Sequence, residues 1–503
     1  MVTQTRGLFE KYTDPAQFAR IIEMDTVTEM WRRCQAEFPE AEAIVDNGVS
    51  YTFARLESDA AGFRTVLAES APGSRVALFA ANSYDFVKAY LATVTSGRTA
   101  VIFPAQLDAA SVFGCCMMFG VSTLVYQPDF ADRVALAEQR IPGLRLIPAD
   151  TLSDEKTPMA DCTGDTPCCI VFTGGTTGRS KGALLSHEAV MQGTVNGCYG
   201  YQDVFSQRYL LILPLSHVFG LIRNLMTSLY TGSTLFICRS NKDMFRDIAV
   251  FRPTILVMVP ALAEMALTLS KKFGRNMLGA DLKYIICGAA AVSPYLVGEY
   301  HKLGITLCPG YGLTESANLV SGNPESLSKP DSVGIPYPNQ ELRVVNGELW
   351  LKGRNMMTGY VGADGSEAYE DGWFKTGDLV RFDEDGYLYI TGRIKEIIVL
   401  SNGENVSPAE VEAHFNRLDC VQDSQVFEDV NDFGAHILAL EVVPRATQLT
   451  DMDPEERKAY ITAQLEQVNA ALPTWQQVSK ITVRDSDFAR TPAMKIVRYQ
   501  KCQ

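Results

Sequence analysis

A segment rich in glycine and threonine stands directly after the apolar run at residues 168–172. It reads FTGGTTGRSKG over residues 172–182. Successive glycines let backbone N–H groups converge on an anion, threonine hydroxyls add further donors, and Lys181 supplies a positive charge. The spacing fits neither the GxxxxGK[ST] nor the GxGxxG phosphate loop. The segment therefore predicts a polyphosphate site of another kind, and the alternative is a Gly/Thr turn with an incidental lysine.

The elements that must position this segment alternate in type along the first part of the chain. Strand-like apolar runs occur at residues 76–81, 100–103, 123–126, 210–213, 234–238 and 255–259, and helix-like stretches occur at 83–95 and 261–272. This alternation is typical of α/β folds with buried sheets. After about residue 334, short strands with Gly and Asp turns predict a β-rich subdomain.

The pattern of residue types changes again near residue 394. There a predicted strand and turn precede a helix that we expect to start at Ser407 and Pro408. The remaining chain is long enough for a small α+β domain. We therefore predict an N-terminal domain of residues 1–393 and a C-terminal domain of residues 394–503, joined by a short hinge.

Composition limits the partners of the chain. The formal net charge of −14 argues against nucleic acid or an anionic membrane as the main partner. Phosphorylated ligands would need local basic residues.

The 12 cysteines form no CxxC and no metal-ligand cluster, which favours buried thiols in a reducing cytoplasm. The most suggestive apolar run, at residues 210–222, is too short to span a bilayer and carries Pro214 and His217. The N-terminus lacks the apolar core of a signal peptide. We expect a soluble cytoplasmic protein.

The glycine-rich segment resembles the phosphate loop of the adenylate-forming superfamily, which includes acyl-CoA synthetases, peptide-synthetase adenylation domains and luciferases. Ser180 stands where proline is usual. Other segments resemble the later blocks of this superfamily in the same order: LPLSHVFGL (213–221), CGAAAVSP (287–294), GYGLTES (310–316), DGWFKTGDL (371–379), GYLYITGRIKE (386–396), SNGENVSPAEVE (401–412) and RTPAMKIVR (490–498). The last block departs by having Met494 where many relatives have glycine.

The resemblance implies both a fold and a reaction. The fold is α/β, with a large N-terminal adenylate-forming domain, built from two mixed sheets and a small β-rich subdomain, and a small mobile α+β C-terminal domain. In the reaction, a carboxylate displaces pyrophosphate from ATP to give an acyl-AMP, and a thiol then accepts the acyl group. A carboxylate is a poor electrophile, so the enzyme must chiefly position and neutralise crowded anions.

The resemblance also assigns roles to residues. Thr314 would bond the α-phosphate, and Glu315 would hold Mg²⁺, unless it is simply a carboxylate at a helix N-terminus. The residues implied for the β and γ phosphates are Thr173, Gly174, Gly175, Thr176, Thr177, Gly178 and Lys181. Those implied for adenine and ribose are Gly288, Ala289, Ala290, Tyr311, Gly312, Asp378 and Ile390. Arg393 is implied for the ribose or a phosphate.

Three further residues complete the candidate site. Lys495 is the expected catalytic residue, as an ammonium that bridges the substrate carboxylate and the α-phosphate. Lys395 stands at the hinge position, about which the C-terminal domain would rotate between the two half-reactions. His217 either lines the acyl channel or is a packed histidine without a chemical role.

The remaining hypotheses about function differ mainly in the thiol that accepts the acyl group. The blocks at residues 213–221 and 490–498 favour coenzyme A. A carrier-protein phosphopantetheine supplied in trans is the alternative, and a silent nucleotide-binding relative is a third. The carboxylic acid stays open, and Arg223 could meet a second carboxylate or face solvent.

Overall fold

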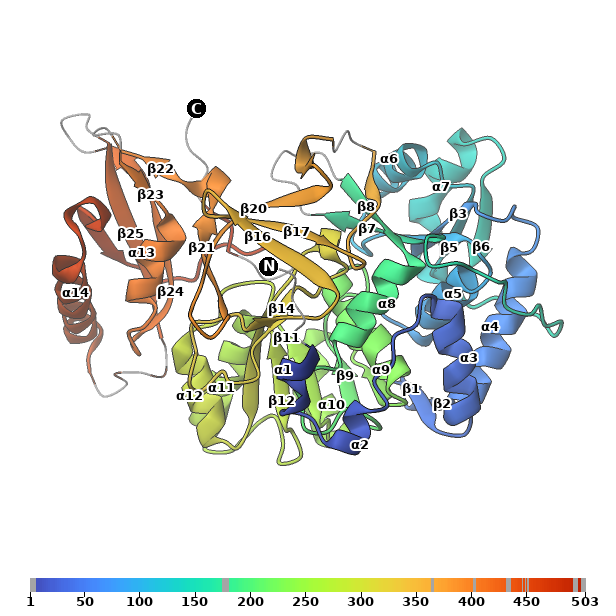
Figure 1. Ribbon diagram of the computed structural model, residues 1–503, viewed down its shortest axis with the longest axis horizontal. Coiled ribbons are helices and arrows are strands. Elements are labelled where there is room, and N and C mark those ends of the chain that lie inside the picture. Colours follow the sequence, from blue (N-terminus) through green and yellow to red (C-terminus); the bar gives the residue numbers. More distant parts are fainter. Residues whose placement is uncertain are drawn as a thin grey trace.

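The structure is a computed structural model that describes residues 6–173, 181–362, 366–400, 404–430, 436–445, 447, 449, 452–491 and 496–498. Two large sheets with helices on their faces make up most of it, and a smaller C-terminal part lies at one side (Figure 1). The main helices are α3 (Val27–Glu37), α4 (Phe53–Leu67), α5 (Tyr84–Val94), α6 (Ala109–Phe119), α7 (Ala131–Arg140), α8 (His187–Asn196), α9 (Thr227–Tyr230), α10 (Met244–Phe251), α11 (Pro260–Phe273), α12 (Pro294–Lys302), α13 (Pro408–Phe415) and α14 (Pro454–Ala471), preceded by the short α1 (Arg6–Glu10) and α2 (Pro15–Phe18).

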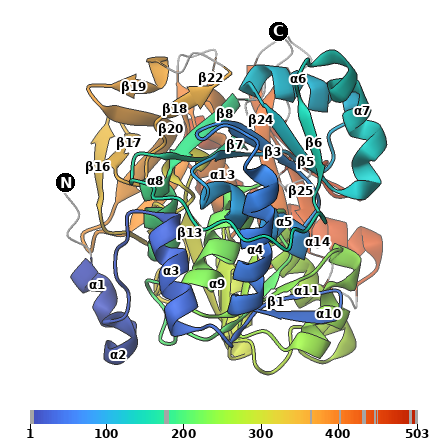
Figure 2. The same ribbon diagram turned by 90° about the vertical axis from the view of Figure 1, so that its right-hand side faces the viewer.

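A seven-stranded sheet holds the glycine-rich segment. Its order is β18 (Gly359–Val361), β8 (Lys181–Ser186), β7 (Pro167–Thr173), β4 (Thr99–Ile102), β3 (Arg75–Phe79), β5 (Thr123–Tyr126) and β6 (Arg145–Pro148). Side chains alternate between its faces: Val76 and Leu78 belong to one hydrophobic cluster with residues of α4 and α5, whereas Ala77 belongs to another with residues of α6 and α7. Figure 2 shows these two pairs of helices beside the sheet. A sheet buried on both faces is what its nearly continuous apolar strands predict.

A nine-stranded sheet forms the other half of the large part. Its order is β15 (Ile335–Pro336), β14 (Ser321–Gly322), β13 (Thr306–Tyr311), β12 (Tyr284–Cys287), β11 (Ile255–Met258), β9 (Arg208–Leu211), β10 (Thr234–Ile237), β1 (Glu42–Asp46) and β2 (Val49–Thr52). The central strands pair in parallel and the edges antiparallel, so the expected two mixed sheets are confirmed. The strands from β9 to β13 all deliver their carboxyl ends to one edge, which favours a site there.

A small sheet follows in the sequence. It contains β16 (Gln340–Val345), β17 (Glu348–Gly353), β20 (Trp373–Phe382), β19 (Tyr369–Glu370) and β21 (Leu388–Arg393). All of its pairs are antiparallel, as the Gly and Asp turns predict.

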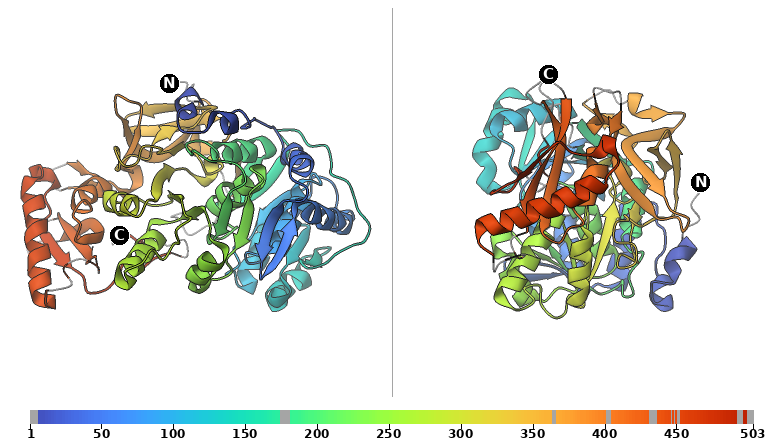
Figure 3. Two further views of the ribbon diagram at one scale, coloured as in Figure 1. Left: turned by 90° about the horizontal axis from the view of Figure 1, so that it is seen from below. Right: turned by 90° about the vertical axis from the view of Figure 1, so that its left-hand side faces the viewer.

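The C-terminal part has its own hydrophobic cluster, which runs from Ile398 to Val483. It consists of the hairpin β22 (Ile398–Val399) and β23 (Asn405–Val406), helices α13 and α14, and the sheet of β24 (Val421–Val430), β25 (His436–Pro444) and β26 (Lys480–Val483). Figure 3 shows α14 on its outer side, away from the two large sheets. Ser407 is the N-cap residue of α13 and Pro408 its first residue, which confirms the expected helix start.

The described cysteines are free thiols, and all but Cys162 are buried. In the described ranges, no helix has the length and apolarity required to cross a membrane.

Candidate functional site

A large cleft opens along the carboxyl edge of the nine-stranded sheet and continues to the small sheet and the C-terminal part. It brings together every candidate site residue that the structure describes: Thr173, Lys181, His217, Gly288, Ala289, Ala290, Tyr311, Gly312, Thr314, Glu315, Asp378, Ile390, Arg393 and Lys395. Gly174, Gly175, Thr176, Thr177, Gly178 and Lys495 lie outside the described residues. Residues that are up to about 220 positions apart in the sequence thus share one cavity, and chain proximity alone does not explain this.

The glycine-rich segment is held at both ends by strand pairing. Thr173 ends β7 and Lys181 begins β8, and the two residues are antiparallel partners. Both line the cleft. A phosphate loop between them would be carried by a rigid sheet.

The turns that follow β12 and β13 leave little room for side chains. Ala289, the second residue after β12, has a φ of 69°, a conformation that costs a residue other than glycine roughly 1–2 kcal/mol. A Cβ on Gly312, directly after β13, would lie 1.2 Å from the backbone oxygen of Asn318. Strained and tightly packed backbone of this kind is typical of ligand-binding turns.

Asp378 lines the cleft, and its carboxylate contacts Tyr311 and Arg393. The Tyr311 hydroxyl donates to Oδ2 at 2.5 Å, and Arg393 Nε lies 2.7 Å from Oδ1. The register of β20 and β21 places Asp378 and Arg393 opposite each other. The carboxyl group is 2% exposed, so its two acceptor oxygens are held at fixed positions.

The surroundings of Asp378 also set the protonation of both donors. Burial raises the pKa of the Tyr311 phenol, and the Asp378 carboxylate raises it further. Burial opposes the charge of Arg393, but the Asp378 carboxylate outweighs it and the pKa of Arg393 is raised. Tyr311 therefore stays a neutral donor and Arg393 a cation.

Glu315 lies on the short 3₁₀ turn η4 (Thr314–Ser316), just after the carboxyl end of β13. The Tyr360 hydroxyl donates to Glu315 Oε1 at 2.6 Å. Lys181 Nζ lies 5.0 Å from the centroid of the Tyr360 ring. Tyr360 thus stands between the lysine and the carboxylate of the site, and burial followed by the Glu315 carboxylate raises the pKa of its phenol.

Sequence reasoning missed Tyr360. It comes from β18, which pairs with β8 so that Tyr360 lies opposite Ala183. This pairing joins segments that are far apart in the sequence. Tyr360 follows the glycine at 359 in an otherwise unremarked stretch, so no local pattern signals its position.

His217 has an exposed side chain on the cleft, in the turn before the π-helical segment η2 (Phe219–Met226). The packed alternative for this histidine does not hold.

The C-terminal part contributes to the cleft through described residues on both sides of positions 492–495. Thr491 and Ile496 line the cleft. Arg498 is held by Glu412, with Nη1 and Nη2 at 2.7 and 2.8 Å from its oxygens, and by Glu396 at 3.2 Å. Lys395 lies on η6 (Ile394–Glu396), directly after β21.

Residues 31–361 match the family described as AMP-binding enzyme, and residues 395–503 match its C-terminal domain. The chain belongs to the AMP-binding enzyme family. This identification confirms the resemblance to adenylate-forming ligases.

Curated relatives of this AMP-binding enzyme include CoA ligases. It is 30% identical over 397 residues to a feruloyl-CoA synthase of an Amycolatopsis species, covering 74% of the chain and 79% of the relative. It is 33% identical over 361 residues to the 4-coumarate–CoA ligase-like protein 6 of Arabidopsis thaliana, covering 66% and 62%.

Solved structures share its fold. An anthranilate CoA ligase in complex with anthranoyl-AMP superposes with a TM-score of 0.82 at 19% identity, covering 94% of this chain and 95% of the other. The o-succinylbenzoate CoA synthetase of Bacillus subtilis gives 0.76 at 22% identity, covering 94% and 98%. The expected fold class is confirmed.

The residues on the cleft fit a Mg²⁺ ion that is bound mainly by the phosphates of a nucleotide. Within the described ranges, no group of three or more His, Cys, Asp or Glu side chains could hold a metal on its own. Magnesium in nucleotide sites is commonly bound by one or two carboxylates together with substrate phosphates, and Glu315 offers one such carboxylate on the cleft.

Proposed function

We propose that this AMP-binding enzyme activates a carboxylic acid with ATP to an acyl-AMP, releases pyrophosphate, and transfers the acyl group to the thiol of coenzyme A. The observation that carries the proposal is the convergence of Lys181, Glu315 and Asp378 on one cleft. The curated CoA ligases among the relatives support coenzyme A as the acceptor.

The proposed roles follow from the charges and positions of the side chains. Lys181 and the loop that it ends bind the β and γ phosphates, and Thr314 binds the α-phosphate. Asp378 accepts hydrogen bonds from the ribose hydroxyls, with Arg393 beside it. Glu315 holds Mg²⁺, which neutralises phosphate charge when bound.

In the first half-reaction, an oxygen of the substrate carboxylate attacks the α-phosphorus of ATP and the bond to pyrophosphate breaks. We propose that Lys495 lies over both groups and stabilises the charge that builds there. In the second half-reaction, the CoA sulfur attacks the acyl carbon and AMP leaves.

The two half-reactions require different access to the acyl group. We propose that residues 394–503 act as a C-terminal domain that rotates about Lys395 between them. In the described arrangement this part is bound to α11 by a buried contact, in which Arg445 Nη1 lies 3.3 Å from Glu264 Oε1. Rotation would have to break that ion pair.

The test is acid-dependent exchange of labelled pyrophosphate into ATP across aliphatic, aromatic, dicarboxylic and amino acids, followed by thioester formation with CoA or a loaded carrier protein in parallel. Exchange and acyl-CoA formation are expected. Absence of exchange with every acid would contradict the proposal, and thioester formation with the carrier alone would replace CoA as the acceptor.

A further inference from the structure

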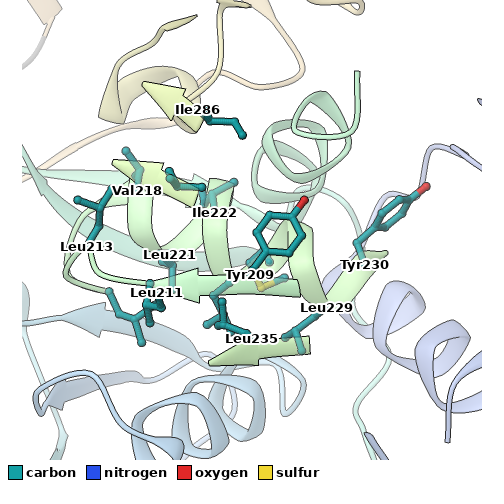
Figure 4. Close-up of a cluster of buried hydrophobic side chains, with 14 of the residues drawn as sticks. Tyr209, Leu211, Leu213, Val218, Leu221, Ile222, Leu229, Tyr230, Leu235 and Ile286 are labelled. Atoms are coloured by element: carbon teal, nitrogen blue, oxygen red, sulfur yellow. The ribbon is translucent and has the colours of Figure 1, made fainter. Parts of the chain in front are cut away.

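Arg223 lies in the middle of η2, which follows the turn that carries His217. Most side chains of this helix are apolar and buried. Figure 4 shows Leu221 and Ile222 in one cluster with Tyr209 of β9. An arginine in this position needs an explanation, because its side chain is fully buried.

The guanidinium of Arg223 has no acidic partner in the part of the chain that the structure describes, and its polar neighbours are the hydroxyls of Tyr201 and Tyr209. Its Nε, Nη1 and Nη2 atoms are all buried without a hydrogen bond, and it forms no salt bridge with a described residue. The ring of Tyr201 lies 5.3 Å from its central carbon, and Tyr209 and Tyr337 stand nearby. These neighbours are neutral phenols, and they cannot neutralise a cation.

Arg223 remains charged in this setting. Burial acts to lower its pKa, but the interactions with Tyr201 and Tyr209 outweigh burial, and the pKa of Arg223 is raised. A cation over an aromatic ring recovers only part of the cost of burying an unpaired charge.

Two other arginines are equally buried, and both are paired. Arg64 forms an ion pair with Glu57 and donates to the backbone oxygen of Thr157. Arg445 forms an ion pair with Glu264 and donates to backbone oxygens. The fold therefore supplies partners where an arginine is only structural, and Arg223 differs from this pattern.

The side chains around Arg223 form one wall of the cleft. Tyr201, Cys308 and Tyr337 all line it, together with His217. Cys308 precedes Tyr311 by three residues in β13, so it lies roughly 10 Å deeper along the strand at the usual rise per residue. Arg223 is thus placed behind the wall of the cleft at Tyr201, Cys308 and Tyr337, away from Thr314 and Glu315 beyond the carboxyl end of β13.

We propose that Arg223 binds a second carboxylate at the far end of the acid, so that the enzyme activates dicarboxylic acids. The planar fork of a guanidinium matches a carboxylate with two parallel hydrogen bonds. Because Arg223 is fully buried behind Tyr201 and Tyr337, these two side chains must move aside for the second carboxylate to reach the fork. This inference rests on the proposed acid activation and specifies its substrate class.

The test is pyrophosphate release with α,ω-dicarboxylic acids of increasing chain length, each compared with the monocarboxylic acid of equal length. In the wild type, kcat/KM for the best dicarboxylic acid should exceed that of its monocarboxylic counterpart by about 100-fold or more, as expected for a buried charge pair. Arg223→Met should abolish the preference by raising the KM of the dicarboxylic acid. Arg223→Lys should retain part of it.

Arg98→Met is the matched control, because Arg98 is buried, outside the cleft, and bonded to the backbone oxygen of Ser70. It should lower thermal stability and leave the acid preference unchanged. The best dicarboxylic acid alone should raise the melting temperature of the wild type but not that of Arg223→Met, which separates binding from turnover.

The inference is overturned if the wild type turns over monocarboxylic acids as well as dicarboxylic ones, or if Arg223→Met keeps the preference. If Arg223→Met fails to fold, the inference is tested by the preference of the wild type for dicarboxylic acids and by the partial preference expected of Arg223→Lys. Pyrophosphate release with monocarboxylic acids would then support acid activation while refuting the substrate class. No release with any acid would refute acid activation itself.

Discussion

Removal of a single hydroxyl group from the site tests the arrangement around Glu315. In Tyr360→Phe the ring that lies beneath Lys181 Nζ is kept, and only the hydrogen bond to Glu315 Oε1 at 2.6 Å is lost. A hydrogen bond to a charged group contributes about 1.5–3 kcal/mol. Because 1.36 kcal/mol corresponds to a factor of ten in rate, kcat/KM should fall roughly 10- to 150-fold.

The assay is acid-dependent pyrophosphate exchange over a range of Mg²⁺ concentrations. If Tyr360 holds Glu315 for the metal, the Mg²⁺ concentration at half-maximal exchange should rise in Tyr360→Phe. The raised pKa of Tyr360 keeps its hydroxyl protonated at neutral pH, so ionisation of the phenol does not complicate the comparison.

Tyr369→Phe is the matched control for this experiment. The Tyr369 hydroxyl donates to the backbone oxygen of Met357 at 3.0 Å, next to the site but not to Glu315. Its loss should cost stability and leave the Mg²⁺ dependence as it was. Equal kcat/KM in Tyr360→Phe and the wild type, or equal losses in the two variants, would refute the reasoning.

Three further predictions concern other parts of the chain. Lys495→Ala should lower pyrophosphate exchange by roughly two decades or more at an unchanged melting temperature, and exchange at the wild-type rate would exclude it as the catalytic cation. Burial raises the pKa of Glu264, though Arg445 acts to lower it. The stability of the wild type relative to Glu264→Gln should therefore decrease as the pH rises through the folded-state pKa, and a difference that stays constant or increases with pH in denaturant unfolding would contradict the raised pKa. Gly312→Ala places a Cβ 1.2 Å from the oxygen of Asn318 and should destabilise the protein by about 4 kcal/mol or more, so an unchanged urea midpoint would contradict the packing.

Local sequence patterns predicted the elements that carry the site. The apolar run at residues 168–172 and the lysine at 181 fall on β7 and β8, and the runs at 123–126 and 255–259 fall on β5 and β11. These strand predictions succeed because a buried strand needs only a short apolar stretch between turn residues. A single sequence displays such a stretch directly.

The contacts between distant segments could not be predicted in the same way. The donation from Tyr360 to Glu315 depends on the pairing of β18 with β8, and the ion pair of Arg445 with Glu264 depends on how the C-terminal part lies against α11. Register between strands that are far apart is set by tertiary packing, and a single sequence does not display it. For Arg223, a second carboxylate and exposure to solvent were both open, and burial excludes exposure.

Two cations without an acidic partner among the described residues match the two anionic groups that the proposed ligands would bring to the cleft. The chain carries a formal net charge of −14, so most basic side chains on the cleft have acidic partners, as Arg393 has in Asp378 and Arg498 in Glu412. Lys181 and Arg223 have no ion pair with any described residue; Lys181 lines the cleft beside Tyr360, and Arg223 lies behind the wall formed by Tyr201, Cys308 and Tyr337. In an acidic protein, uncompensated positive charge is best placed where an anionic ligand completes it. A polyphosphate at one end and a second carboxylate at the other would neutralise both.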